Sequence, residues 1–281
     1  MICGMNSQDE SHIAAPRFIT NANDALNDLR LFVNSARAGL DFYSQLSTMR
    51  ENLREAARRG LIDEVIDDDV EDYVRYGAEQ LTAGMPYLYG LATVQLVTIL
   101  EAAVTDACIE ALIIWPGLRQ RVAIRDIQGP LVEFAAMTSM EQAEYIVAAI
   151  AERTGRKLKS SVGRFEAVLD AIGLDGGVDD RVRKIIREML EIRNVVIHRR
   201  GHADMRLVRN CPWLGVSVGT EIRITKAMFD RYLAAMKCYV VELFCRWSVL
   251  DGASEETVTP TRQHLAAMIT KFESGSAPGS G

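Results

Sequence analysis

The sequence lacks the short motifs by which several classes of enzyme are recognised. It contains no G-x-G-x-x-G or Walker loop for nucleotide phosphates, and no elbow motif around a nucleophilic serine or cysteine. Its five cysteines include no C-x-x-C pair and no framework spacing, which argues against a zinc ribbon and against a disulfide-stapled domain. We therefore expect reduced thiols and a cytoplasmic location.

The chain also lacks an excess of positive charge and a signal peptide. Its net charge of -6 argues against a general binder of polyanions, although a local basic patch could still hold RNA. The first residues, MICGMNSQDESH, contain no basic region followed by an apolar run. No charge occurs between Glu79 and Glu101, but Gly84, Pro86 and Gly90 interrupt this stretch. It predicts a buried helix rather than a membrane span.

Apolar residues at helical spacing predict an all-α protein. The expected helices cover residues 23–59 (capped by Thr20 or Asn23), a segment ending near 82, 87–115, 139–153, 165–172, 179–200, 226–250 and 259–272. Residues 216–224 (VSVGTEIRI) alternate around Gly219 and predict a small β-hairpin. We divide the chain into an N-terminal helical region packed on the core (1–85), a helical domain (86–250) and a tail with a short helix and a flexible SGSAPGSG end (251–281).

The most informative stretch is DDRVRKIIREMLEIRNVVIHRRG, residues 179–201. On a helical wheel Arg193 falls within an apolar stripe formed by Val182, Ile185, Ile186, Met189, Val196 and Ile197. Because an arginine cannot shed its charge, one placed there needs a carboxylate, a bound anion or a partner subunit. His198 lies off the stripe and one turn beyond Asn194.

Two further groups of residues leave alternatives open. His198 and His202 have i,i+4 spacing, but Gly201 intervenes and no third ligand is evident, so we predict no metal site. The segment RTGRKLKSSVGR places Lys157 and Lys159 among several cations, which are either a solvated surface or phosphate contacts.

The string Arg193-Asn194-Val195-Val196-Ile197-His198 resembles the R-x4-H motif of HEPN domains, which often carry asparagine after the arginine. LVTILEAAVTDAC resembles the first core helix of that family, and LGVSVGTEIRIT resembles the stretch that follows its motif. The connector IRDIQGP is similar to one found in standalone bacterial HEPN proteins of about this length. The resemblance covers residues 87–250.

This resemblance implies an antiparallel helical bundle with long N-terminal helices, usually dimeric, that cuts RNA without a metal or other cofactor. His198 would act as general acid and base, Arg193 would stabilise the phosphorane, and Asn194 would orient the site, with Arg199, Arg200, Lys157 and Lys159 binding RNA. The products would be a 2′,3′-cyclic phosphate and a 5′-OH end. Such proteins serve as toxins or in phage defence, sometimes under a regulatory or antitoxin protein. The alternative is a catalytically silent HEPN module that dimerises or holds RNA.

The resemblance leaves open what neutralises Arg193. Glu101 and Asp106 are acidic residues embedded in a strongly apolar helix, where burial would favour their neutral forms unless a cation lay near. We predict that Glu101 faces Arg193, with Asp106 as the second choice. The competing interpretation is that Glu101 lies on a solvent-facing edge.

Overall fold

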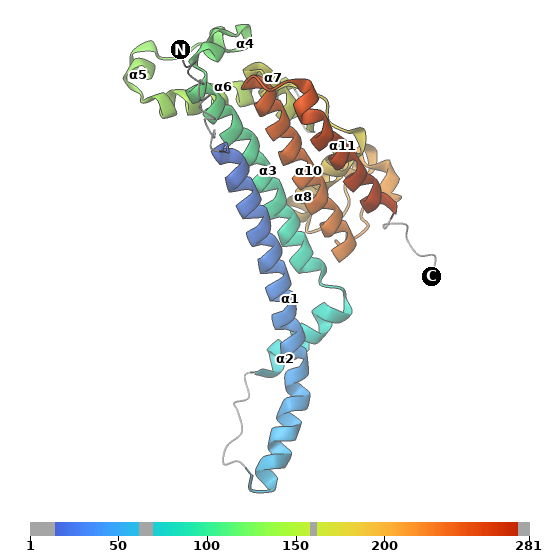
Figure 1. Cartoon of the computed structure of the whole chain (residues 1–281). Coiled ribbons are helices and arrows are strands. Elements are labelled where there is room, and N and C mark those ends of the chain that lie inside the picture. Colours follow the sequence, from blue (N-terminus) through green and yellow to red (C-terminus); the bar gives the residue numbers. More distant parts are fainter. Residues whose placement is uncertain (1–14, 62–69, 158–161, 275–281) are drawn as a thin grey trace, which may run out of the picture.

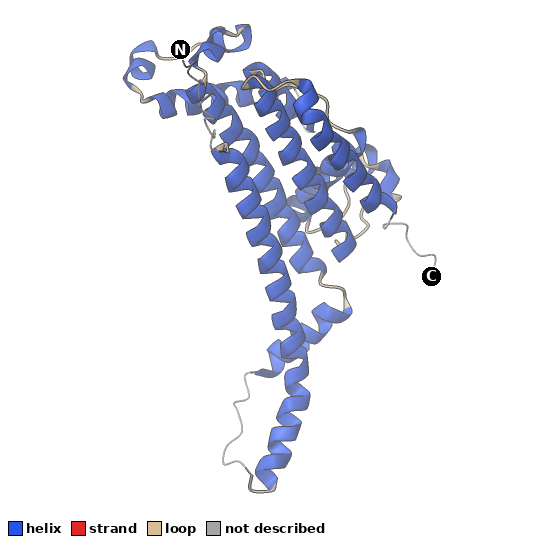
Figure 2. Cartoon of the chain, in the orientation of Figure 1, coloured by secondary structure: helices blue, strands red, loops and turns tan. Residues whose placement is uncertain are grey.

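The computed structural model describes residues 15–61, 70–157 and 162–274, which are almost wholly helical and contain no strand (Figure 2). The main helices are α1 (Arg17–Arg58), α2 (Val70–Thr82), α3 (Pro86–Ile114), α6 (Ser139–Lys157), α7 (Val162–Ile172), α8 (Asp180–Arg199), α10 (Lys226–Leu250) and α11 (Glu255–Ser274). Shorter turns of helix are η1 (Pro116–Gln120), α4 (Val122–Arg125), α5 (Leu131–Ala136), α9 (Met205–Asn210) and η2 (Pro212–Leu214). The prediction of an all-α protein is confirmed.

Helix α3 lies at the centre of the bundle and contacts α1, α6, α7, α8 and α10 (Figure 1). It begins at Pro86, the first helical position, where the missing N–H is not needed. Leu96, Leu100, Ala107 and Leu112 are fully buried, because neighbours surround this helix on several sides. The uncharged stretch is therefore a core helix, as expected. None of the helices in the described residues combines the length and apolarity that crossing a membrane requires.

Helix α1 runs along the bundle and then projects beyond it with α2 (Figure 1). Its 42 residues correspond to about 63 Å at 1.5 Å per residue. On the projection, α2 crosses α1 closely at Gly77, where a Cβ would lie 3.2 Å from the backbone oxygen of Leu40. Nearby, the rings of Tyr43 and Tyr73 lie tilted against each other by 36°, with their centroids 6.2 Å apart. A glycine lets the two backbones approach at this crossing.

The start of α1 differs from the sequence expectation. The helix begins at Arg17, six residues before Asn23, and has no side-chain cap of its own. Glu110 of α3 takes that role, because its carboxylate accepts the backbone N–H groups of Arg17 (2.9 Å) and Phe18 (3.1 Å). A carboxylate from another helix thus satisfies free N–H groups and complements the positive end of the α1 dipole. No sequence-local pattern signals such a cap.

The β-hairpin predicted at 216–224 is wrong. In its place, the described residues 201–225 hold α9, η2 and one isolated antiparallel bridge between His202 and Glu221. Backbone hydrogen bonds join Ala203 to Thr220 and Gly219, so the segment pairs with the residues that follow α8. Alternation of apolar and polar residues over so short a stretch cannot distinguish a β-hairpin from an irregular segment with a single bridge.

The C-terminal segment is more ordered than the sequence indicated. Helix α11 covers 20 residues, Glu255–Ser274, and packs along α10 (Figure 1). Val258, Leu265 and Ile269 are buried, because they lie on the face that meets the bundle. The predicted short helix at 259–272 is therefore a full element of the fold. Of the SGSAPGSG end that the sequence predicts to be flexible, Ser274 is the last residue of α11, and residues 275–281 lie outside the described part.

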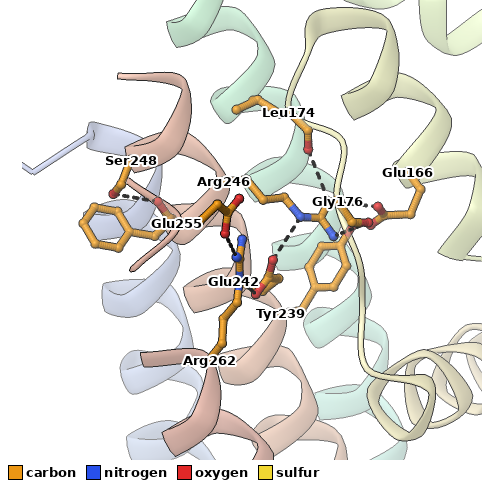
Figure 3. Close-up of polar contacts among 10 residues, drawn as sticks. Glu166, Leu174, Gly176, Tyr239, Glu242, Arg246, Ser248, Glu255 and Arg262 are labelled. Atoms are coloured by element: carbon orange, nitrogen blue, oxygen red, sulfur yellow. Dashed lines mark hydrogen bonds and ion pairs between the residues drawn. The ribbon is translucent and has the colours of Figure 1, made fainter. Parts of the chain in front are cut away.

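A buried network of charges joins α7, α10 and α11 (Figure 3). Arg246 contacts Glu166 (2.8 Å) and Glu242 (3.4 Å), and donates to the backbone oxygens of Leu174 (3.2 Å) and Gly176 (3.1 Å). The other contacts are those of Tyr239 with Glu166 (2.5 Å) and of Arg262 with Glu242 (3.0 Å) and Glu255. Because Arg246, Glu166, Glu242 and Arg262 each have two or more partners, the network joins the helices structurally and leaves none of these four groups free to react.

Candidate functional site

The candidate site occupies the C-terminal half of α8, whose start is well defined. Asp179 caps the helix by accepting the backbone N–H of Arg181 at 2.8 Å. The predicted apolar stripe is correct for Val182, Ile185, Ile186 and Met189, all of which are buried. It fails in the last turns, where Val196 is half-buried and Ile197 is 45% exposed. The end of α8 therefore extends past the core and presents its side chains at the surface.

Two buried glutamates on α8, Glu188 and Glu191, were missed by the sequence reasoning. Glu188 accepts hydrogen bonds from Trp213 Nε1 (2.6 Å), the Tyr232 hydroxyl (2.7 Å) and Arg231. Burial of Tyr232 and the adjacent Glu188 charge raise the pKa of the Tyr232 phenol well above its ordinary value. The ring of Trp213 is thereby held against α8.

Glu191 is held in the same way by the segment that follows the site. It pairs with Arg206 Nε (2.8 Å) and accepts a hydrogen bond from Asn210 Nδ2 (2.7 Å), both on α9. On the helical wheel Glu188 lies beside Ile185 and Ile192, which is a signal of burial, whereas Glu191 falls opposite the apolar stripe, so no pattern within α8 indicates that it is buried. These carboxylates fix α9 and η2 on the side of α8.

Arg193 lies half-buried between the core and the exposed end of α8. Its Nη1 donates to Asn194 Oδ1 at 3.3 Å, while its Nε is buried without a hydrogen-bond partner. Among the described residues no carboxylate lies within ion-pair distance of this guanidinium. Arg193 therefore keeps an uncompensated positive charge beside a neighbouring amide that orients it.

The predicted pairing of Glu101 with Arg193 is wrong within one chain. Glu101 binds Arg164 of α7 instead, with Nη2 and Oε1 3.2 Å apart, and both side chains are about 40% exposed. The reason is the rotation of α3 about its axis. This rotation turns Glu101 toward α7, and not toward α8, which carries Arg193. The alternative interpretation of Glu101, a partly exposed position at an edge, describes it better.

Asp106, the second choice, is half-buried near the start of α1. Burial raises the pKa of its carboxyl, a shift that a hydrogen bond from the Asn21 side chain opposes and the nearby Glu110 charge increases. Neither embedded acid of α3 therefore supports Arg193. Both instead serve contacts between α3 and its neighbours.

His198 and the cations after it form the exposed end of the site. His198, Arg199 and Arg200 are all exposed, and none has a carboxylate partner in the part of the chain that the structure describes. Arg193, Asn194, His198 and Arg199 thus lie on the last two turns of α8, with Arg200 directly after them, and among these residues only Arg193 and Asn194 are joined by a hydrogen bond. We call these five residues the α8 cationic end.

The helix terminates at Arg200 in an unusual conformation. Arg200 has φ 54° and Gly201 has φ 79°, so two successive residues occupy the left-handed region. The backbone N–H groups of both bond to the oxygen of Val195, which satisfies a carbonyl at the end of the helix. Glycine adopts this region freely, whereas arginine does so at a steric cost. This turn reverses the chain, which leads directly into the antiparallel bridge between His202 and Glu221.

Of the other residues considered in the sequence, His202 contacts this end only through backbone oxygens, and the two lysines cannot be placed there. His202 is exposed, and its Nδ1 lies near the backbone oxygens of Arg199 (3.3 Å) and Arg200 (3.2 Å). Lys159 and the side chain of Lys157 lie outside the described residues. In the part that is described, no three His, Cys, Asp or Glu side chains gather in a group that could hold a metal ion.

Comparison with known proteins adds no family assignment. Neither the protein-family models nor the curated proteins nor the solved structures include a match to this chain. The interpretation of the site therefore depends on its residues and their geometry.

Proposed function

We propose that this chain is a HEPN-type endoribonuclease that acts at the α8 cationic end. The observation that carries the proposal is the uncompensated charge of Arg193, which only the neutral Asn194 contacts among the described polar groups. A planar guanidinium without a carboxylate partner is suited to bind a phosphate. The exposed Arg199 and Arg200 add positive charge next to it in a chain whose net charge is -6.

The residues suit cleavage by the 2′-hydroxyl of RNA. His198 takes the proton of the 2′-OH as its oxygen forms a bond to phosphorus, and the bond from phosphorus to the 5′-oxygen breaks. The departing 5′-oxygen receives a proton from an imidazolium. Arg193 balances the negative charge on the phosphorane, and Asn194 holds the guanidinium in place. The products are a 2′,3′-cyclic phosphate and a 5′-OH end.

Assembly into a homodimer would complete this chemistry, so we include it in the proposal. His198 is one acid/base group in each chain, whereas the reaction needs a base and an acid. Two α8 helices related by a two-fold axis would supply both groups. Ile197, which is 45% exposed beside His198, would gain apolar burial in such an interface. Light scattering at micromolar concentration should give twice the mass of the 31.2 kDa chain.

The decisive experiment incubates the purified protein with total RNA in EDTA and analyses the ends of the fragments. We expect 2′,3′-cyclic phosphate and 5′-OH ends from the wild type, and a loss of at least ~100-fold in rate for His198→Gln. His264→Gln is the matched control, because His264 is an exposed histidine on a different helix, α11. Cutting by His198→Gln at the wild-type rate, or loss of cutting in EDTA, would refute the mechanism.

Arg193→Gln tests the phosphate contact separately. It should slow cleavage by ~100-fold or more if the guanidinium meets the phosphorane. Arg209→Gln on α9 replaces an exposed arginine and should leave the rate unchanged. Equal effects of the two substitutions would show only a general electrostatic contribution.

A second function, an RNA-holding module without catalysis, is favoured by one observation. His198 has no hydrogen-bond partner among the described residues, whereas a catalytic base is normally oriented by a second group. A filter-binding assay and a cleavage assay, run on the same variants, distinguish the nuclease from the RNA-holding module. RNA binding that falls in Arg193→Gln, without cutting by any variant, would establish the module.

A further inference from the structure

A small apolar cavity lies at the other end of the bundle, between η1, α4, α5 and α6. Its volume is about 270 Å³, just below the ~300 Å³ at which ligand pockets commonly begin. The polar members of its lining are Arg119 and Tyr145. The other side chains that line it are apolar: Ile124, Ile127, Leu131, Phe134 and Ile146. An apolar cavity with two convergent polar groups fits a small amphipathic molecule.

Arg119 is held at this cavity without being neutralised. Its Nη1 donates to Gln142 Oε1 at 2.8 Å, and its buried Nε has no hydrogen-bond partner. The Gln142 amide is itself fixed, because its Nε2 donates to the backbone oxygens of Phe134 (3.1 Å) and Met137 (3.2 Å). Among the described residues no carboxylate pairs with this arginine. A rigid, neutral support therefore presents a cation that has no counter-ion.

Tyr145 places a second polar group at the same cavity. Its ring packs edge-on against Phe134 with the centroids 5.6 Å apart. A Cβ at Gly129 would lie only 2.1 Å from the hydroxyl, so the absence of a side chain there makes room for it. No described residue hydrogen-bonds to this hydroxyl. It is free to donate to a bound oxygen atom.

The rim of the cavity is apolar as well as the wall. Leu131 lines the cavity yet is 79% exposed. The apolar part of a ligand would cover this exposed leucine. Each CH₂ group of the ligand that is buried there contributes about 0.8 kcal/mol to binding. The lining offers few acceptors, so a chain without polar groups along its length fits best.

We propose that this cavity binds a medium-chain fatty acid. The carboxylate accepts hydrogen bonds from Arg119 and the Tyr145 hydroxyl, and the alkyl chain lies against Ile124, Phe134 and Leu131. The cavity is separate from the α8 cationic end, and the proposal is independent of the ribonuclease proposal.

The test measures octanoate and 1-octanol binding to the full chain by calorimetry, with thermal unfolding as a check on folding. Octanoate should bind and raise the Tm, and Arg119→Gln should weaken it by about tenfold or more, the value of a charge-assisted hydrogen bond. Arg125→Gln is the control, because Arg125 is exposed on the adjacent α4. 1-Octanol should bind at least about tenfold more weakly than octanoate.

A second pair of variants avoids any effect on folding. Leu131→Asp places a negative charge at the rim and should abolish octanoate binding, whereas Val132→Asp should not. Both residues are exposed (79% and 83%) on the same helix, but only Leu131 is among the residues lining the cavity. No octanoate binding by the folded wild type, equal binding of 1-octanol, or equal effects of the two aspartates would overturn the proposal.

Discussion

Arg246 and Glu166 form an ion pair of 2.8 Å that joins α10 to α7 across 80 positions of sequence. The Arg246 side chain is 2% exposed and Glu166 is 19% exposed, so solvent screens the pair weakly. The same guanidinium donates to two backbone oxygens of the loop after α7 (Figure 3). This pair therefore sets how the loop that precedes α8 is attached to the bundle.

Removing one member of this pair should be far more damaging than removing an exposed pair. We expect Arg246→Met to lower the free energy of unfolding by about 3–5 kcal/mol, because Glu166 and Glu242 lose a buried counter-ion. Arg58→Met is the control, since Arg58 pairs with Glu55 at the surface and should change stability by under ~0.5 kcal/mol. Urea unfolding followed by circular dichroism measures both, and similar values for the two variants would contradict the assignment.

Two adjacent glycines provide a matched test of packing around Arg246. A Cβ at Gly176 would lie 2.7 Å from Arg246 Nε, whereas a Cβ at Gly177 would meet nothing within 4 Å. We expect Gly176→Ala to destabilise the protein by about 1–3 kcal/mol through overpacking. Gly177→Ala should leave stability unchanged or raise it by up to about 1 kcal/mol, since it restricts the unfolded chain. Thermal unfolding of the two variants decides, and the opposite order would contradict this geometry.

Asp106 and Asp179 should respond to pH in opposite directions. Burial raises the pKa of Asp106, so the folded state holds its proton more tightly, and this residue's contribution to stability falls as pH rises from the unfolded value of 3.8. A hydrogen bond from Arg181 lowers the pKa of Asp179, so its contribution is present above 3.8 and is lost as pH falls through the folded value.

The two asparagine variants isolate these contributions. At pH 7, Asp106→Asn should be at least as stable as the wild type, and Asp179→Asn should be less stable, although asparagine caps a helix as well as aspartate does. Both differences should shrink as the wild-type carboxylates take up protons, at a lower pH for Asp179 than for Asp106. Urea unfolding at pH 3 and pH 7 measures them, and a destabilised Asp106→Asn at pH 7 would show that its charge is needed.

Arg200 combines backbone strain with a place in the α8 cationic end. Because its φ is 54°, we expect Arg200→Gly to raise the free energy of unfolding by about 1 kcal/mol. The same change removes a cation and should weaken RNA binding in a filter-binding assay. Arg199→Gln, with an ordinary helical backbone, should weaken binding without the gain in stability. A loss of stability in Arg200→Gly would show that the side chain makes a structural contact.

Local patterns in the sequence determined most of the helices. The helical periods predicted α3, α8 and α10 to within about two residues, and Pro86 and Thr225 marked two of the starts correctly. The absence of charge before Glu101 correctly indicated a core helix. These features depend on spacing within one helix, which the chain carries whatever its neighbours are.

The sequence alone also singled out the last two turns of α8, and the structure shows Arg193 and Asn194 in contact there. It could not say which carboxylate belongs to which cation. Glu101 pairs with Arg164, 63 positions away, and Glu110 caps a helix more than 90 positions earlier. The rotation of each helix about its axis decides such contacts.

Only the tertiary structure decided where the buried charges lie and which cavities form. Three features each combine residues from three or more elements: the contacts of Arg246, those of the two buried glutamates of α8, and the cavity beside Arg119. The burial of a charge depends on what all of its neighbours exclude from water. No periodicity within a single helix contains that information, because it arises only when the helices pack.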